Sequence, residues 1–165
     1  MDIRLFDAST DFDVIKGWIS DERTHMLWCA GRLPFGYGPD EFVSFLEGIH
    51  SKNGDVPYVA VSDGKPVGFY TYSASDSEGM LKFVVVDPSM RGQGIGSEML
   101  RLAAAHAFED PSISAVHLNV FSSNLPARKC YEKVGFVERN ITPSAFSFGS
   151  ESWARVNMIL YRSAL

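Results

Sequence analysis

The stretch that most constrains the fold of this chain runs from Met80 to Leu102, and it predicts a buried strand, a sharp turn and a helix start. Residues 81–86 are nearly all apolar and rich in β-branched side chains, which favours a central strand covered on both faces. Pro88 ends this strand, because proline has no N–H for a ladder and moves Asp87 out of the helical region. The following helix is expected to bury one face, formed by Ile95, Met99, Leu102 and His106.

Three glycines mark the turn itself, in the sequence Arg91-Gly92-Gln93-Gly94-Ile95-Gly96-Ser97. The first N–H groups of a helix lack partners, and the helix dipole adds partial positive charge, so this turn suits an anion and above all a phosphate. Arg91 adds a full charge and a forked donor. Ser97 excludes two common phosphate loops, because a Walker loop needs Gly-Lys-Ser/Thr and a dinucleotide fingerprint needs a third glycine. For this stretch alone, a flexible glycine-rich turn is the alternative.

Composition narrows the class of protein. The chain has 165 residues, 45% hydrophobic and 21% charged, as expected for one globular domain over residues 1–165. A net charge of −5 without a basic run argues against a nucleic-acid partner, and the apolar runs are too short to span a bilayer. No signal peptide begins at Met1, and Cys29 and Cys130 form no spacing motif. We therefore expect a cytoplasmic protein with free thiols and no metal.

Alternation, helical spacing and turn residues predict the remaining elements. Strands are expected over residues 2–6, 56–61, 67–73, 81–86, 114–121, 136–140 and 153–161. Helices are expected after Asp7, over 21–28, from Pro39, over 95–108 and after Asn124, with Gly135 ending the last one. Three antiparallel strands thus lead into the glycine turn, and the helical crossover from 81–86 to 114–121 implies that those two strands pair in parallel.

A second motif lies in the segment Asn119–Phe136, which places Asn124, Tyr131 and then Gly135-Phe136 after a strand. Together with the glycine turn, this segment resembles the GNAT superfamily of N-acetyltransferases. The first GNAT motif is Gln or Arg, two residues, Gly, one residue, and Gly or Ala; the matching positions here are Arg91, Gly94 and Gly96. Each residue of the second motif also has a purely structural interpretation, Asn124 as a helix cap and Tyr131 as a core aromatic.

The resemblance implies a fold and a co-substrate. The fold is α/β (mixed α+β), a GNAT-type single domain with a mixed sheet of about seven strands, flanking helices and a splayed pair formed by strands 81–86 and 114–121. In that family the glycine turn holds the diphosphate of acetyl-CoA, and the preceding strand offers its backbone to the pantetheine arm. The residues expected to bind acetyl-CoA are Phe83, Val84, Val85, Val86, Arg91, Gly92, Gln93, Gly94, Ile95, Gly96, Ser97, Asn124, Ala127, Arg128 and Tyr131.

The chemistry implied by the resemblance is attack of an amine on a thioester. A lysine-type amine, with a pKa of about 10.4, is mostly protonated at neutral pH, so a general base or a water chain must remove a proton. The resemblance assigns oxyanion stabilisation to a backbone N–H near Val85 and protonation of the departing thiolate to Tyr131. Glu78, at the entry to strand 81–86, is the first candidate base, although it could equally be a solvated turn residue. Weaker candidates are His25, His117 and Asp76.

The acceptor site is expected to contain aromatic and polar side chains. The residues expected to line it are Trp28, Phe35, Tyr37 and Asn119, where Phe35 and Tyr37 have loop packing as their alternative role. Lys82 is a charge inside an apolar strand, and the sequence leaves open whether it reaches solvent or faces the cleft.

The sequence is compatible with three functions. The leading hypothesis is an acetyl-CoA-dependent N-acetyltransferase that acts on a primary amine of a small molecule or peptide through a ternary complex. The alternatives are N-terminal protein acetylation, as in ribosomal-protein acetyltransferases, and a non-catalytic CoA-binding sensor. A homodimer is one assembly that the resemblance allows.

Overall fold

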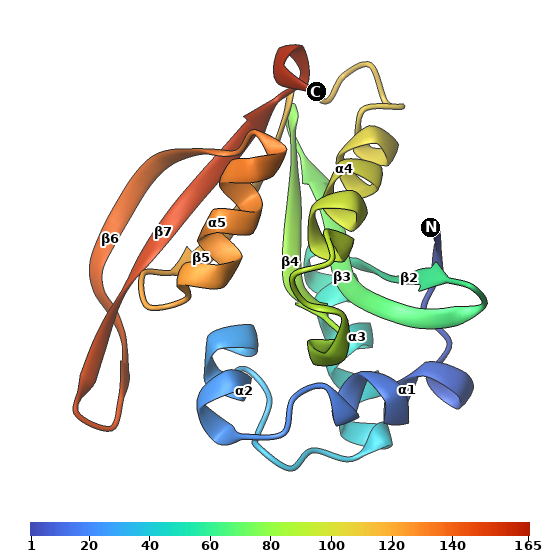
Figure 1. Cartoon of the computed structure of the whole chain (residues 1–165), viewed down its shortest axis with the longest axis vertical. Helices are drawn as coiled ribbons and strands as arrows, with labels where there is room; N and C mark the ends of the chain where they lie inside the picture. Colours follow the sequence, from blue (N-terminus) through green and yellow to red (C-terminus); the bar gives the residue numbers. More distant parts are fainter.

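The computed structural model describes residues 1–165 as one mixed seven-stranded sheet with helices on both faces (Figure 1). The strands are β1 (Asp2–Leu5), β2 (Val56–Ser62), β3 (Lys65–Ser75), β4 (Glu78–Val86), β5 (Ala115–Phe121), β6 (Val137–Phe148) and β7 (Glu151–Tyr161). The helices are α1 (Ala8–Gly17), α2 (Glu22–Cys29), α3 (Pro39–Asn53), α4 (Ile95–Ala107) and α5 (Leu125–Val134), with 3-10 turns at Pro88–Met90 and Arg162–Ala164. The strand order is β1-β2-β3-β4-β5-β7-β6.

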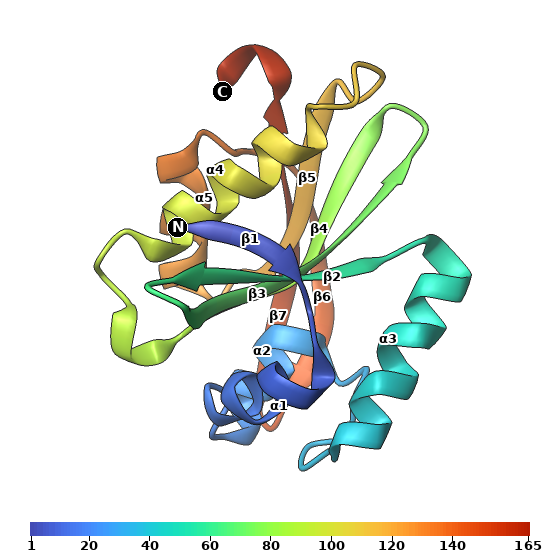
Figure 2. The ribbon, with the colours of Figure 1, turned by 90° about the vertical axis from the view of Figure 1, so that its right-hand side faces the viewer.

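Only β4 and β5 pair in parallel, and every other neighbouring pair is antiparallel. This arrangement confirms the mixed α/β sheet that the sequence predicts, including the parallel crossover through α4. The right-handed twist of such a sheet accounts for the way the two halves turn away from each other in Figure 2.

The helix ends lie where local chemistry places them. Asp7 and Asp21 cap α1 and α2, accepting hydrogen bonds from the N–H groups of Ser9 and Thr24 at 2.9 and 2.8 Å. Proline opens α3 at its first position. Gly135 ends α5 in the left-handed region, at φ +115°.

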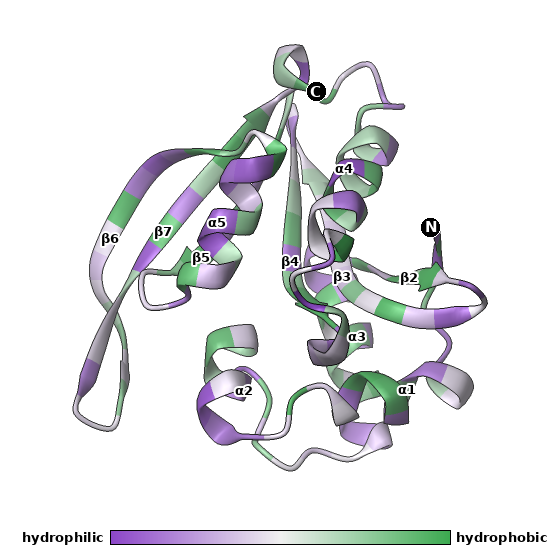
Figure 3. Ribbon diagram, viewed as in Figure 1, coloured by the Kyte–Doolittle hydropathy of each residue, from purple (hydrophilic) through white to green (hydrophobic).

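The sheet separates two hydrophobic cores. Helices α4 and α5 cover one face, over a cluster that includes Leu81 of β4 and Leu118 of β5. Helices α1, α2 and α3 cover the other face, over an aromatic-rich cluster that includes Phe42 and Phe69. Figure 3 shows apolar residues along α4 and β4, and hydrophilic residues on the outer surface of α5. Burial of these side chains, at about 1.5–3 kcal/mol each, is the main force that holds the helices on the sheet.

The face that α4 buries differs from the predicted one. The buried residues are Ser97, Met99, Leu100, Ala103, Ala104 and Ala107, whereas Leu102 is only half-buried and His106 is exposed. The small alanines let the helix lie close to the sheet, and the sulfur of Met99 occupies the place that a Cβ would need at Gly68. Close packing through small residues, rather than the widest apolar spacing, thus decides the rotation of α4.

Strand β6 is longer than the sequence predicts, because it extends to Phe148. Nearly all of its residues are exposed, so it lacks the alternation that marks a half-buried strand. Its far end is held by pairing with β7 from Phe146↔Trp153 to Phe148↔Glu151, and the Phe146 and Trp153 rings stack at 5.6 Å.

Candidate active site

Strands β4 and β5 diverge in the middle of the sheet. They pair only from Glu78↔Ala115 to Leu81↔Leu118, although β4 continues to Val86 and β5 to Phe121. Beyond Leu81, the edge of β4 that faces β5 therefore has no strand to pair with. The separation of the two strands is visible in Figure 1, and it is the splayed pair that the sequence resemblance predicts.

A bulge in β4 begins where this divergence starts. Lys82 pairs with Thr71 and Val85 with Phe69, so Phe83 and Val84 together oppose one residue of β3. Phe83 adopts φ +52°, a left-handed conformation that is costly for a bulky side chain. The bulge breaks the alternation of β4: Leu81 belongs to the core under α4 and α5, whereas Phe83 and Val85, two and four residues later, belong to the core under α1–α3.

A pocket of about 250 Å³ lies at this opening, between α2, β4, β5 and β7. Its lining residues are Leu27, Trp28, Cys29, Ala30, Arg32, Met80, Leu81, Lys82, Phe83, Asn119, Val120, Phe121 and Arg155. We call it the splay pocket. Trp28 and Asn119, expected from the sequence at the acceptor site, both line it, and so does Phe83 of the bulge.

Trp28 is fixed by the bulge itself. Its indole N–H donates a hydrogen bond to the carbonyl oxygen of Phe83 at 2.8 Å, and the two rings meet edge to face at 6.0 Å. Helix α2 is thereby tied to the irregular part of β4.

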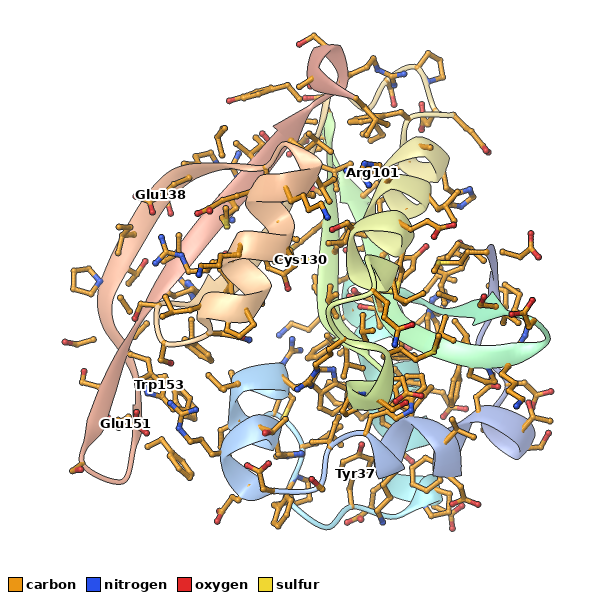
Figure 4. The ribbon with its side chains drawn as sticks, in the orientation of Figure 1. Tyr37, Arg101, Cys130, Glu138, Glu151 and Trp153 are labelled. Atoms are coloured by element: carbon orange, nitrogen blue, oxygen red, sulfur yellow. The ribbon has the colours of Figure 1, made fainter.

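Phe35 and Tyr37, the other two residues expected at the acceptor site, do not line the splay pocket. Tyr37 is buried in the α1–α3 core, where it stacks on Trp28 at 6.2 Å, and Figure 4 shows it among those helices. Phe35 is exposed and contacts His25 edge to face. The loop folds back onto α1 and α3 rather than over the strand opening, because Tyr37 packs between Phe12 and Phe42.

The glycine turn presents a row of free donors. No backbone N–H from Gly92 to Ser97 donates a hydrogen bond within the protein, and the first N–H of the helix that is bonded belongs to Glu98. Gly92 and Gly94 adopt φ +78° and +85°, which glycine alone adopts without strain. Gly94 is the N-cap of α4 and supplies no side chain to these donors. The turn therefore has the geometry that an anion requires.

Gly96 has a different requirement, which is close packing. A Cβ at Gly96 would lie 3.1 Å from the sulfur of Cys130 on α5. Cys130 also contacts the hydroxyl of Ser97 at 3.5 Å, and Figure 4 shows it on the side of α5 that faces α4. The start of α4 and the middle of α5 thus lie together beside the glycine turn.

The remaining residues of the second motif have clear structural partners. Asn124 is the N-cap of α5 and accepts a hydrogen bond from the N–H of Ala127 at 3.4 Å, which is the capping role that the sequence left open. The guanidinium of Arg128 lies 3.4 Å from the carboxylate of Glu138 on β6. Arg128 is therefore engaged with β6 in this structure.

Tyr131 is buried in the core under α4 and α5, the cluster that also contains Leu81 and Leu118 at the end of the parallel pairing. Burial raises the pKa of its hydroxyl, and the nearby thiol of Cys130 raises it further. Tyr131 is therefore protonated throughout the neutral range. It is also a weaker acid than the ordinary tyrosine on which the sequence argument relied.

Glu78 lies at the first paired position of β4 and is held by Arg139 of β6. One nitrogen of Arg139 donates to both carboxylate oxygens at 2.9 Å. The Nε2 of His117 lies 3.8 Å from the same carboxylate. Burial and, secondly, the charge of Arg139 lower the pKa of His117, against the opposing effect of Glu78. The imidazole is consequently neutral at physiological pH.

The three weaker candidates for the general base, His25, His117 and Asp76, lie in different surroundings. His25 is fully buried, and its Nε2 lies 2.9 Å from the carbonyl oxygen of Leu33, which gives it a structural role. Asp76 and His117 line a second, polar pocket of about 700 Å³ beside the β3–β4 hairpin. The lining of this hairpin pocket is Lys52, Asn53, Ser73, Ala74, Ser75, Asp76, Ser77, Glu78, Met80, Lys82 and His117. Met80 and Lys82 line both pockets, so the two pockets lie next to each other.

The hydrogen-bond partners of Lys82 show where its side chain lies. Its ammonium donates to the carboxylate of Asp55 at 2.8 Å and to the hydroxyl of Ser73 at 3.1 Å. Asp55 is 1% exposed and also accepts a hydrogen bond from Thr71. The side chain of Lys82 therefore lies on the face of the sheet covered by α3, where it pairs with a buried acid. Lys82 is the residue immediately before the bulge.

Several polar residues of this region could not be identified as site residues from the sequence. Arg32, Arg139, Arg155 and Asn157 lie on elements read only as loop or strand, and nothing in their neighbourhood along the chain marks them. No group of three or more His, Cys, Asp and Glu side chains is placed to hold a metal ion. None of the helices is both long and apolar enough to cross a membrane.

Comparisons with known proteins agree with this geometry. The sequence model of the acetyltransferase (GNAT) family matches residues 18–136. An aminoglycoside N(6')-acetyltransferase type 1 of Klebsiella pneumoniae is 26% identical over 140 residues, which cover 76% of this chain and 69% of that protein.

Two solved structures show the same fold over almost the whole chain. Spermidine N-acetyltransferase from Vibrio cholerae, in complex with CoA and spermine, superposes with a TM-score of 0.80 at 17% identity and covers 99% of this chain and 96% of that one. Aminoglycoside acetyltransferase AAC(6')-Ib, in complex with ribostamycin and coenzyme A, superposes with a TM-score of 0.77 at 21% identity and covers 98% of this chain and 93% of that one. With its free glycine turn, its splayed strands and a family match over most of its length, this chain belongs to the acetyltransferase (GNAT) family of acyltransferases.

Proposed function

We propose that this protein transfers the acetyl group of acetyl-CoA to a primary amine of a small molecule, by direct attack within a ternary complex. The observation that carries the proposal is the row of free N–H groups from Gly92 to Ser97 beside the diverging strands β4 and β5. The first feature holds a diphosphate, and the second leaves room for an extended arm. Relatives whose names include aminoglycoside and spermidine acetyltransferases support an amine acceptor.

The residues around the glycine turn fit a CoA diphosphate. Six consecutive N–H groups, two glycines with positive φ and the exposed Arg91 combine donors, access and charge. We assign the loop Arg91–Ser97 to the diphosphate and the backbone of Phe83–Val86 to the pantetheine arm. Asn124, Ala127 and Arg128, at the start of α5, are assigned to the same cofactor, and Arg128 would exchange its contact with Glu138 for a phosphate.

The bound co-substrate would supply an activated thioester. Beyond Leu81, N–H groups on the edge of β4 have no partner in β5, and we assign one near Val85 to the oxyanion that forms on attack. Tyr131, protonated because it is buried, is assigned the delivery of a proton to the departing sulfur. A desolvated thiolate is a stronger base than one in water, which offsets the raised pKa of the tyrosine.

Removal of the amine proton is assigned to the pair Glu78 and His117. Arg139 occupies both oxygens of Glu78, which leaves that carboxylate poorly placed to act alone. His117 is neutral, lies 3.8 Å from Glu78 and lines the hairpin pocket, which lies next to the splay pocket. A water molecule in that pocket would complete the path from the amine to the Glu78–His117 pair.

Two measurements on the purified protein test this function. Titration calorimetry with CoA is expected to show binding, and a thiol-release assay with acetyl-CoA and a panel of amines is expected to show acceptor-dependent turnover. Absence of CoA binding by folded protein would overturn the proposal. Binding without turnover on any amine would identify a CoA sensor instead, and turnover restricted to peptide N-termini would identify a protein acetyltransferase.

A further inference from the structure

We propose that the amine acceptor of this enzyme also carries a carboxylate, which Arg32 and Arg155 bind in the splay pocket. This inference rests on the proposed function and names the class of its substrate: a small amino acid rather than a polyamine or an aminoglycoside.

The charge of the splay pocket is opposite to that of the whole protein. The chain has a net charge of −5, yet the thirteen lining residues include Arg32, Lys82 and Arg155 and no aspartate or glutamate. Lys82 is neutralised by Asp55 at 2.8 Å. The two guanidinium groups therefore set the charge of the pocket.

Arg32 has no acidic partner. Its guanidinium lies over the rings of Phe83 and Phe45, at 5.2 and 5.5 Å from their centroids. A guanidinium stacked on an aromatic ring keeps the N–H donors at its edge free, and the fork of these donors matches a carboxylate. Because Phe83 is the bulge residue, this contact places a ready donor fork next to the diverging strands.

Arg155 is the corresponding cation on the other side of the pocket. It lies on β7, opposite Phe121 of β5, and its only side-chain hydrogen bond is to the hydroxyl of Thr142 at 3.5 Å. A contact of that length is weak, so most of the donors of Arg155 are available to a ligand. Arg32 and Arg155 come from the loop after α2 and from β7, and both line this pocket.

A third donor follows from the hydrogen-bond network behind Asn119. The Nε of Arg139 can only donate, and it contacts the side-chain oxygen of Asn157 at 2.7 Å, which fixes the orientation of that amide. The NH₂ of Asn157 then donates to the side-chain oxygen of Asn119 at 2.9 Å. The NH₂ of Asn119 is thereby left without a partner, in a residue that lines the splay pocket. The polar groups that the pocket offers are therefore donors, as an anion requires.

Two acids beside the pocket, Asp55 and Glu78, are already paired. Asp55 is bound by Lys82, and Glu78 is bound by Arg139 through both oxygens. An acceptor with several ammonium groups would find no free carboxylate in the splay pocket and would be repelled by its guanidinium groups. Pocket size agrees with this choice, because about 250 Å³ is below the range of about 300–1,000 Å³ that holds drug-sized ligands.

The test compares matched acceptors that keep or lack the carboxylate. Free α-amino acids and their carboxamides are assayed by thiol release with acetyl-CoA, along with spermidine and kanamycin. We expect the free acids to be preferred in kcat/KM by about tenfold or more, since a charge-assisted bidentate contact is lost in the amides. Equal or better turnover of the amides, or of the polycations, would overturn this inference and leave the acetyltransferase function intact. No turnover of any acceptor would instead contradict the proposed function.

Variants of the two arginines assign the effect to the pocket. Arg32→Gln and Arg155→Gln are each expected to lower the acid-to-amide preference by about tenfold, through KM of the acceptor, with the affinity for CoA unchanged. Arg155→Glu is expected to reverse the preference, a gain that misfolding cannot produce. Lys65→Gln removes one charge on the β2–β3 hairpin, outside both pockets, and serves as the control. Loss of CoA binding in the arginine variants, or an unchanged preference, would contradict the proposal.

Discussion

The indole N–H of Trp28 donates a hydrogen bond to the carbonyl oxygen of Phe83 across 55 residues of sequence, at 2.8 Å. This contact joins α2 to the one residue of β4 that has a positive φ, so the helix over the splay pocket and the bulge that opens it are held as one unit. The hydrogen bond stabilises a backbone conformation that Phe83 would otherwise avoid.

Replacing the indole tests this link. Trp28→Phe keeps an aromatic ring and removes the donor, which leaves a carbonyl unpaired in a half-buried place. We expect a loss of about 1–3 kcal/mol in the free energy of unfolding, together with a fall in kcat. Urea unfolding and steady-state assays measure the two effects. A variant with unchanged stability would show that Phe83 holds its conformation without α2.

Tyr37→Phe is the matched control, with the opposite expectation. The Tyr37 hydroxyl is buried without a hydrogen-bond partner, and burial raises its pKa to about 12. Removing an unpaired buried hydroxyl costs no hydrogen bond, so the variant is expected to be as stable as the wild type or more stable by about 1 kcal/mol. Marked destabilisation in thermal melts would reveal a partner for this hydroxyl, such as a buried water.

Two substitutions at Gly94 are expected to lower the affinity for CoA to different degrees. Gly94→Ala places a side chain at φ +85°, where nothing lies within 4 Å of the new Cβ, so its cost is backbone strain of about 1–2 kcal/mol. Gly94→Asn is the matched variant, because asparagine tolerates the left-handed region better. We expect CoA affinity to fall more for alanine than for asparagine, as measured by calorimetry. Equal affinities would argue that access, rather than conformation, requires glycine at this position.

Tyr131→Phe separates chemistry from binding. The hydroxyl is assigned to the departing sulfur, whereas the ring fills the core beside Phe136 at 6.1 Å. The variant is expected to keep its fold and its CoA affinity and to lose turnover by about 10²–10⁴-fold, as is usual for a general acid. A steady-state kcat equal to that of the wild type would remove Tyr131 from the mechanism.

The lowered pKa of His117 predicts that both stability and kcat/KM fall on acidification. Burial lowers its pKa below the ordinary value of 6.5, so the unfolded chain binds more protons than the folded one as the pH falls below about 6.5. Stability contributed by this residue is therefore complete above that pH and is lost as the pH falls towards the folded pKa. The acid limb of kcat/KM is likewise expected below pH 6.5.

His117→Gln tests both expectations, because glutamine does not titrate in this range. Thermal melts between pH 5 and 8 should show a weaker decline on acidification than the wild type, and the acid limb of the rate profile should shift. An acid limb that is identical in the variant would assign the proton transfer to Glu78 or to another group.

The buried pair of Lys82 and Asp55 gives a prediction about stability. Lys82→Met would leave the Asp55 carboxylate buried with only Thr71 as a partner, at a cost of about 3–5 kcal/mol. The double variant Lys82→Met/Asp55→Asn removes both charges and should recover much of that loss, since the amide can still accept from Thr71. Denaturant melts of the single and double variants measure the difference, and equal losses would show that the pair is screened by solvent.

The local features of this protein could be predicted from residues that lie close together in the chain. The donor row of the glycine turn follows from where glycine and the helix start fall, and the caps at Asp7, Asp21 and Gly135 follow from residues that act within one turn of their own position. The antiparallel run that leads into the glycine turn and the parallel pairing of β4 with β5 followed from alternation and from the length of the crossover. These features could be predicted because their physical causes act over a few residues.

Contacts between side chains far apart in the sequence depend on the packing of whole elements. The ion pair of Glu78 with Arg139 spans 61 residues, and the link of Trp28 to Phe83 spans 55, so each depends on strand register and not on local pattern. The same holds for Arg32 and Arg155, which share a pocket because β4 bulges and β5 diverges. The bulge, the rotation of α4 and the burial of Tyr37 were likewise set by packing between elements. A sequence pattern describes one element at a time and does not contain these contacts.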